Sequence, residues 1–150
     1  MQIDAAAPAL RASLASGYTG EMTSDPETCP TGAPMIRTIA MPADTNPEGD
    51  IFGGWLISQM DMAGATLAFD EAKGRCATVA ADDIVFLKPV YVGDEVSVFC
   101  TVQRIGHTSI TVAVEAWRRS RQSPDVEKVT SGIFTYVALG DDRRPRPVKG

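Results

Sequence analysis

The segment Asn46–Phe69 reads NPEGDIFGGWLISQMDMAGATLAF and decides how the rest of this chain is interpreted. From Gly53 to Phe69 it is long enough for a helix of several turns, and Asp61 is its only charged residue. Apolar side chains fall on every face, which is typical of a helix that is buried in a core or spans a membrane. A membrane span needs about 20 predominantly apolar residues, more than this interrupted segment offers. The segment therefore predicts a central helix wrapped by other elements, with a carboxylate in its middle.

The start of this helix carries the first hint of chemistry. It opens on Gly53 and Gly54, whose missing side chains let a ligand approach free backbone N–H groups at the positive end of the helix dipole. A polar triplet, Asp44–Asn46, lies just upstream. An anion-friendly helix start, an amide and an isolated acid are the components of an acyl-transfer site. A structural role for Asp61, paired with an arginine or a backbone amide, stays open at this point.

Composition sets the class of protein. The chain has 150 residues and 44% hydrophobic content, which suits one globular domain with a sizeable core. A net charge of −5 argues against nucleic acid as a partner. Three cysteines without CxxC spacing and a single histidine leave little for a zinc site, so we expect reduced thiols in a cytoplasmic protein. The N-terminus has no basic and apolar pattern of a secretory signal.

Five segments around the helix have strand character. The segments are Met35–Met41, Cys76–Val90, Glu95–Ile105, Thr108–Arg119 and Val129–Leu139. One strand, one buried helix and four successive strands predict an α+β fold, with an antiparallel sheet curled around the helix. We expect this domain to span residues 35–140. Residues 1–34 form an extension in which 5–16 favour a short helix, and residues 141–150 form a basic C-terminal tail.

Four motifs carry a resemblance to a known family. They are MPADTNPEGDIFGGWLISQMDMAGA (41–65), FLKPVYVGDEV (86–96), RIGHTSI (104–110) and SGIFTYVA (131–138). Together they resemble the acyl-CoA thioesterases of the hotdog fold, specifically the YciA-like group. The resemblance implies a curved antiparallel β-sheet wrapped around one long central helix, which agrees with the periodicity. It also implies hydrolysis of acyl-CoA to a free acid and CoA, with CoA as part of the substrate and no other cofactor.

The resemblance implies roles for individual residues. Asp61 would act as general base or nucleophile on the thioester, and Asn46 would orient water or the thioester. The amides of Gly53 and Gly54 would polarise the carbonyl. The chemistry tolerates a single carboxylate, because a CoA thiol with a pKa near the cysteine value of about 8.5 leaves largely as thiolate.

Spacing along the helix adds a prediction about assembly. Eight residues separate Gly53 from Asp61, about 12 Å of helix rise, so one helix hardly brings both groups to one carbonyl carbon. We therefore expect an obligate homodimer with composite sites, in which Asn46 and Gly53 of one subunit face Asp61 of the other. The resemblance further implies that such dimers often assemble as a trimer of dimers, a homohexamer.

CoA carries phosphates, so an acidic protein needs a local basic patch to bind it. We expect Lys88, Arg104 and Arg119 to contribute. Family position implies hydroxyl contacts from Thr108 and Ser109. Other basic candidates are Arg118, Arg121, Arg143, Arg144 and Arg146.

Alternative readings remain at this stage. Residues 44–55 resemble a calcium loop, but its twelfth position, which should be a bidentate Glu, is Trp55, so we expect no metal site. A non-catalytic acyl-CoA-binding module would bind without turnover and would be indifferent to Asp61→Asn. An enoyl-CoA hydratase of this fold would use a neighbouring Asp and His, whereas the only histidine, His107, falls in a distant turn.

Overall fold

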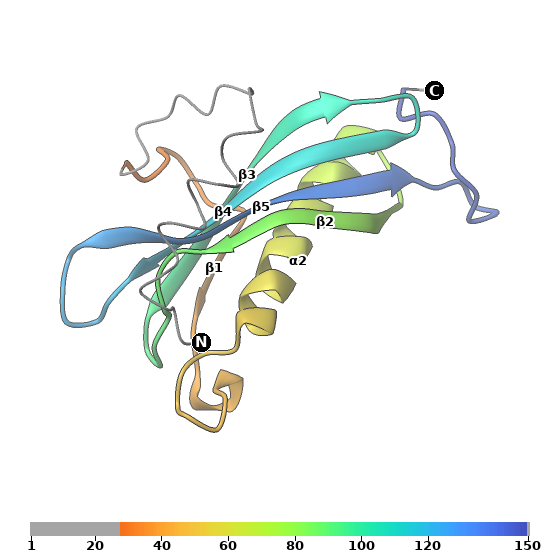
Figure 1. Cartoon of the computed structure of the whole chain (residues 1–150). Helices are drawn as coiled ribbons and strands as arrows, with labels where there is room; N and C mark the ends of the chain where they lie inside the picture. Colours follow the sequence, from red (N-terminus) through yellow and green to blue (C-terminus); the bar gives the residue numbers. More distant parts are fainter. Residues whose placement is uncertain (1–27, 150) are drawn as a thin grey trace.

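A computed structural model describes residues 28–149, and the short helix expected within residues 5–16 lies outside them. The elements are β1 (Ile36–Ile39), the 3-10 helix η1 (Pro42–Asp44), α2 (Gly53–Ala72), β2 (Cys76–Phe86), β3 (Glu95–Ile105), β4 (Ser109–Arg119) and β5 (Val126–Ala138). The strands form one antiparallel sheet in the order β1-β3-β4-β5-β2, and α2 lies along one face of it (Figure 1). The predicted α+β architecture is confirmed.

Alternation along the inner strands places the core on the face toward α2. In β4, Ile110, Val112, Val114 and Ala116 are buried, while the residues between them are partly exposed. In β5, Phe134 and Tyr136 are buried in the same way. A period of two is what a half-buried strand requires, and it is why the sequence predicted β3 and β4 almost residue for residue.

The predicted antiparallel sheet around one central helix is confirmed, and within one protomer the sheet covers one face of α2. The face toward the sheet is built largely from small residues, among them Ala63, Gly64 and Ala68, which let the helix approach closely. Larger apolar side chains point outward, with Met62 47% and Phe69 57% exposed. This bare apolar face indicates that another surface covers it.

The strand β2 forms one edge of the sheet and is irregular. Its pairing with β5 shifts register between Thr78 and Ala80 and again between Asp82 and Val85, where Asp83 adopts φ 52°. Bulges of this kind re-aim side chains and are frequent beside active sites. Val79, at the first of these register shifts, is 57% exposed.

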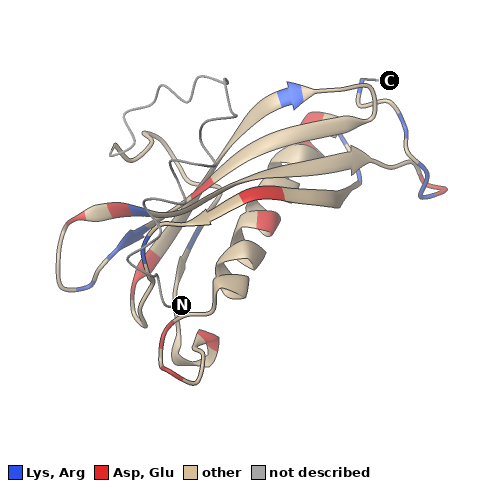
Figure 2. Cartoon of the chain, viewed as in Figure 1, with Lys and Arg blue, Asp and Glu red and all other residues tan. Residues whose placement is uncertain are grey.

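Ion pairs join the strands at the end of the sheet where β3 begins and β4 ends. The Arg118 guanidinium contacts Asp94 at 3.1 Å and Glu127 at 2.9 Å, and Lys88 contacts Glu127 at 2.9 Å. Figure 2 shows basic and acidic segments side by side at this end, whereas α2 is largely uncharged. These two cations hold the pKa of the Glu127 carboxyl below its usual range, with the Lys88 hydrogen bond as the larger cause.

The segment after β5, expected as a basic tail, packs back against α2. Its Arg146 donates to the carbonyl of Ala72 at 2.8 Å, which satisfies one of the unpaired carbonyls at the helix C-terminus. Val148 is buried, and its N–H donates to the His107 carbonyl. The helix itself ends at Ala72, and its C-cap residue Lys73 adopts φ 53°. Within residues 28–149, no helix has both the length and the apolar character to cross a bilayer.

Candidate active site

Asp61 lies in the middle of α2 and is held by two hydroxyl groups. Thr78 Oγ1 donates to its Oδ1 at 2.7 Å. Tyr136 Oη lies 3.2 Å from the same Oδ1 and 3.0 Å from the Asp61 backbone carbonyl. Among the described residues, no cation and no donor contacts the other carboxylate oxygen, Oδ2. The carboxylate is therefore fixed through one oxygen and open at the second.

Sheet register explains why these two hydroxyls meet at one carboxylate. Thr78 of β2 and Tyr136 of β5 are direct cross-strand partners, so their side chains lie next to each other on the same face. Neither residue was predicted from the sequence, because they stand 17 and 75 positions from Asp61. The only signal available was the inward position of a tyrosine on β5, since a buried tyrosine hydroxyl usually has a partner.

Burial fixes the protonation of this tyrosine. Tyr136 is 0% exposed, and desolvation followed by the nearby Asp61 carboxylate raises its pKa far above the ordinary value. The hydroxyl therefore keeps its proton and remains a donor to Asp61.

Asn46 organises the loop before the helix and keeps its amide donors. Its Oδ1 accepts hydrogen bonds from the N–H of Glu48 at 3.1 Å and of Asp50 at 3.0 Å. This use of the side-chain oxygen in a turn is typical of asparagine. The Asn46 NH₂ group has no acceptor among the described residues. The side chain can therefore donate to a carbonyl oxygen but has little acceptor capacity left for positioning water.

The first turn of α2 is left without a cap. The N-cap residue, Phe52, offers no side-chain acceptor, and no described group accepts from the Gly53 or Gly54 N–H. Gly54 is exposed, and a Cβ on it would meet nothing within 4 Å. A Cβ on Gly53 would approach the Phe86 ring at 3.0 Å, which explains the glycine there. The helix start thus presents two uncommitted donors to an accessible space.

These two groups of residues lie apart within one protomer. Gly53 packs against Phe86 at the end of β2, whereas Asp61 contacts Thr78 near its beginning. The eight residue steps from Gly53 to Asp61 correspond to about 12 Å along the helix. A single protomer therefore does not bring its own donors and its own carboxylate to one carbonyl carbon.

The residues predicted to bind CoA divide between the two ends of the sheet. Arg104 is the penultimate residue of β3, Thr108 lies in the turn that follows, and Ser109 begins β4. Ser109 pairs with Val137, the neighbour of Tyr136, so this turn lies at the same end of the sheet as the Asp61 carboxylate. Among the described residues, no carboxylate pairs with Arg104.

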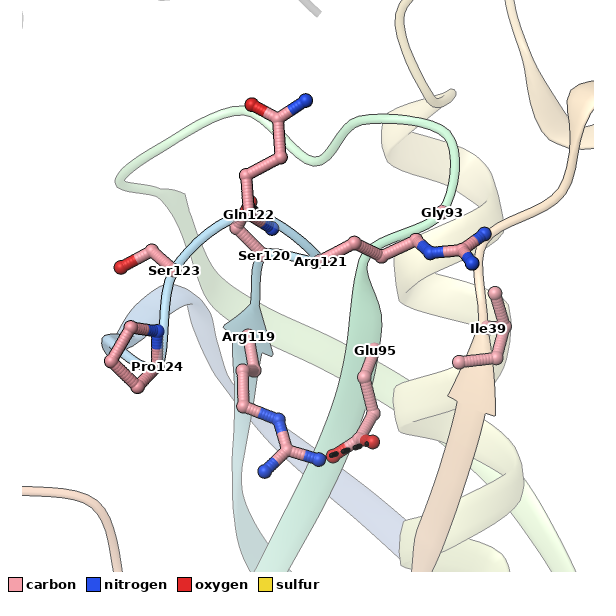
Figure 3. A pocket seen from close by; sticks show the side chains of 9 residues that line it. All are labelled: Ile39, Gly93, Glu95, Arg119, Ser120, Arg121, Gln122, Ser123 and Pro124. Atoms are coloured by element: carbon pink, nitrogen blue, oxygen red, sulfur yellow. Dashed lines mark hydrogen bonds and ion pairs between the residues drawn. The ribbon is translucent and has the colours of Figure 1, made fainter.

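Lys88 and Arg119 lie at the other end, where both form ion pairs. Arg119 contacts Glu95 at 2.7 Å and lines a cavity of about 680 Å³ between the ends of β3 and β4 (Figure 3). Nine strand residues separate Arg119 from Ile110, the β4 partner of Tyr136, which corresponds to about 30 Å. This cavity is therefore distinct from the Asp61 region of the same protomer.

Residues 28–149 contain no candidate metal site. No cluster of three His, Cys, Asp or Glu side chains there could hold a metal ion. The carboxylate, the amide donors and the hydroxyls are the groups that the described site offers for chemistry.

Comparison with known proteins places this arrangement in a family. Residues 48–124 match the family model of the thioesterase superfamily. The acyl-CoA thioester hydrolase YciA of Salmonella typhimurium is 47% identical over 122 residues, covering 79% of this chain and 92% of that protein. A hexameric thioesterase from Yersinia pestis is 49% identical with a TM-score of 0.75, covering 79% of this chain and 97% of the other.

A more distant relative has been crystallised with ligands. The acyl-CoA hydrolase of Staphylococcus aureus, in complex with butyryl-CoA and CoA, is 28% identical with a TM-score of 0.70, covering 75% of this chain and 68% of the other. Further structures of it carry alanine at an asparagine and at an aspartate fifteen positions later. The family match, the sequence identity to these relatives and the shared fold all indicate the same family. This chain belongs to the thioesterase superfamily, as a YciA-like acyl-CoA thioester hydrolase with the hotdog fold.

Proposed function

We propose that the protein hydrolyses acyl-CoA to a free acid and CoA at a site shared by two protomers. Asp61 of one protomer acts as general base or nucleophile. Asn46 and the amides of Gly53 and Gly54 of the other protomer bind the thioester carbonyl oxygen. The observation that carries the proposal is the Asp61 carboxylate itself, which is fixed through Oδ1 and has no described partner at Oδ2.

The donor groups support a role in stabilising negative charge. When a nucleophile attacks the thioester carbon, charge develops on the carbonyl oxygen, and preorganised N–H donors stabilise it. The uncapped amides of Gly53 and Gly54 and the NH₂ group of Asn46 are donors of this kind. Asn46 and Asp61 also stand fifteen positions apart, the spacing of the two residues replaced in the Staphylococcus aureus variants.

The bond changes balance without a cofactor. In the base route, Asp61 takes a proton from water, the water oxygen bonds to the carbonyl carbon, and the C–S bond breaks to release CoA thiolate. In the nucleophile route, a carboxylate oxygen of Asp61 bonds to that carbon and expels the thiolate. Water then hydrolyses the resulting anhydride. Both routes need the donors at the carbonyl oxygen and an accessible carboxylate oxygen.

A second protomer explains the bare apolar surface. Met62 and Phe69 on the outer face of α2 form this surface, and each is at least 47% exposed. Packing two protomers through it would bury these side chains and would carry each helix start toward the partner's Asp61. The hexameric state of the Yersinia pestis relative is consistent with such an assembly, here a dimer that also forms a trimer of dimers.

The nucleotide end of CoA fits the turn between β3 and β4. Arg104 offers a cation without a carboxylate partner among the described residues, and Thr108 and Ser109 offer hydroxyls. Lys88 and Arg119 are already paired with Glu127 and Glu95, so they would contribute only if those ion pairs opened. We therefore assign the phosphate contacts to Arg104 and the 108–109 turn in the first place.

The test is thiol release from acyl-CoAs of graded chain length, followed with a thiol-reactive dye. Asp61→Asn should lower kcat about a hundredfold or more, because it removes the group that activates water or attacks. Asp70→Asn is the matched control, since it makes the same change on the same helix at an exposed residue whose only described contact is with Lys73. The control should match the wild type.

Two results would refute parts of the proposal. Equal turnover by wild type and Asp61→Asn would leave a thioesterase with a different site. Binding of acyl-CoA without thiol release by either protein would identify a binding module and remove the hydrolytic function.

A further inference from the structure

Tyr136 reaches Asp61 through a notch in the helix. Gly64 lies three residues after Asp61, one turn further along the face of α2 that packs on the sheet. A Cβ at this position would collide with the Tyr136 hydroxyl oxygen and would lie 3.0 Å from the ring carbon that bears it. The missing side chain therefore makes the space in which the hydroxyl sits.

A glycine in the interior of a helix needs a structural explanation. It costs more backbone entropy than alanine and lowers helix stability. The helix dihedral angles at Gly64 do not require glycine, because only residues with positive φ do so and Gly64 is not among them. The Tyr136 hydroxyl is the described neighbour that excludes a larger residue.

The two hydroxyls on Asp61 differ in rigidity. Thr78 is exposed and belongs to the edge strand β2, next to a bulge. Tyr136 is fully buried on β5, between β4 and β2, and its ring stacks with Phe134 at 6.4 Å between centroids. A side chain that is locked by packing positions a catalytic group more firmly than an exposed one.

We propose that Tyr136, seated against Gly64, is a positioning residue that orients the Asp61 carboxylate so that Oδ2 faces the thioester. The inference rests on the catalytic role proposed for Asp61. Tyr136 bridges the backbone carbonyl and Oδ1 of that one residue, so its hydroxyl restrains rotation of the side chain relative to the helix. With the hydroxyl removed, Oδ1 keeps only the contact from Thr78.

The first test compares Tyr136→Phe with wild type by steady-state thiol release. We expect kcat to fall roughly ten- to hundredfold with KM unchanged, because the hydroxyl touches the carboxylate and not the substrate, and small misplacements of a reacting group have effects of this size. Tyr91→Phe is the control. It removes the same atom from a tyrosine that is 48% exposed and whose described side-chain contact is the Arg118 guanidinium over its ring.

A second test asks whether Gly64 and the Tyr136 hydroxyl act through the same contact. Gly64→Ala should lower both kcat and the thermal midpoint, because the new methyl group displaces the phenol. In the Tyr136→Phe background the colliding oxygen is gone, so the same Gly64→Ala change should have a much smaller additional effect on both. Non-additivity of this kind identifies two residues that act through one contact.

The outcomes separate this inference from the proposed function. Wild-type kcat in Tyr136→Phe, beside an inactive Asp61→Asn, would overturn the positioning role and leave the thioesterase site intact. Full activity of Asp61→Asn would instead overturn the site assignment. A Tyr136→Phe chain that is unfolded, or that raises KM at constant kcat, would make the contact structural or substrate-binding and would also overturn the inference.

Discussion

Asp61 and Glu127 are both carboxylates on this domain, and the fold treats them in opposite ways. Glu127 lies between two cations, Lys88 and Arg118, at 2.9 Å from each. Asp61 has no ion pair with a described residue and receives only neutral hydroxyls, both on one oxygen. The first carboxylate is neutralised and serves the connection between strands. The second is oriented but not neutralised.

This difference supports the catalytic role proposed for Asp61. A cation close to a carboxylate forms a charge-assisted hydrogen bond that occupies the oxygen a substrate would need. Hydroxyl donors fix geometry without supplying a counter-charge, so they orient the carboxylate and leave it without an ion-pair partner. The absence of a described cation around Asp61 is therefore as informative as the presence of Thr78 and Tyr136.

The largest expected effect tests whether Asn46 and Asp61 of one site come from different protomers. Asn46→Ala and Asp61→Ala proteins should each be nearly inactive, yet mixing them should restore about a quarter of wild-type activity. Half of randomly exchanged dimers are mixed, and each of these holds one complete site out of two. Thiol release after subunit exchange, which is verified by mass spectrometry of differently tagged subunits, measures the recovery. Exchange without recovery would place the whole site within one protomer.

The next effect tests the donor half of the site. Gly54→Pro removes one N–H from the first helical turn, where proline is tolerated because that N–H has no intrahelical partner. We expect kcat to fall on the order of a hundredfold, the usual cost of losing one oxyanion donor. Gly54→Ala keeps the N–H and has open space for its methyl group, so it should retain most of the activity. Equal activity in both variants would exclude this amide as a donor.

A third experiment gives Asp61 the environment of Glu127. Thr78→Lys places an ammonium group within reach of the Asp61 carboxylate, on an exposed edge-strand position that tolerates the longer side chain. We expect kcat to fall about ten- to hundredfold, because the cation occupies the carboxylate. Thr78→Ser keeps the hydroxyl donor and should remain active. An active Thr78→Lys variant would show that the missing counter-charge is not essential.

The smallest effect is expected at the paired carboxylate. The pKa of Glu127 is lowered from 4.5 in the folded protein, so its ion pairs stabilise the fold above about pH 4.5, and this contribution is lost as pH falls through the folded-state pKa. At pH 7, Glu127→Gln should lower the thermal midpoint by about 1–3 °C, since the pair is partly exposed. The difference between variant and wild type should shrink progressively as pH falls below about 4.5, and turnover at pH 7 should not change. A midpoint difference that stays constant across this acid range would contradict the electrostatic origin.

The sequence predicted the fold well where one local pattern decides the structure. The start of α2 at Gly53 and both ends of β3 agree with the structure, because a glycine pair and a period-two alternation mark them. Thr78 and Tyr136 could not be found in this way. Their contact with Asp61 depends on the register between β2 and β5, which involves residues far apart in sequence. The exposed outer face of α2 was not predicted for a related reason. When apolar residues lie on all sides of a helix, their pattern does not indicate which face the sheet of the same protomer covers.

The notch at Gly64 also has a consequence for inheritance. A glycine codon becomes an alanine codon by one nucleotide change, and a tyrosine codon becomes a phenylalanine codon by one as well. Because the methyl group and the hydroxyl oxygen cannot share the same space, a lineage with alanine at 64 should carry phenylalanine at 136. Such a lineage would still lack the hydroxyl on Asp61 and would have weakened thioester turnover. Both residues should therefore be retained among descendants of this gene that keep the activity.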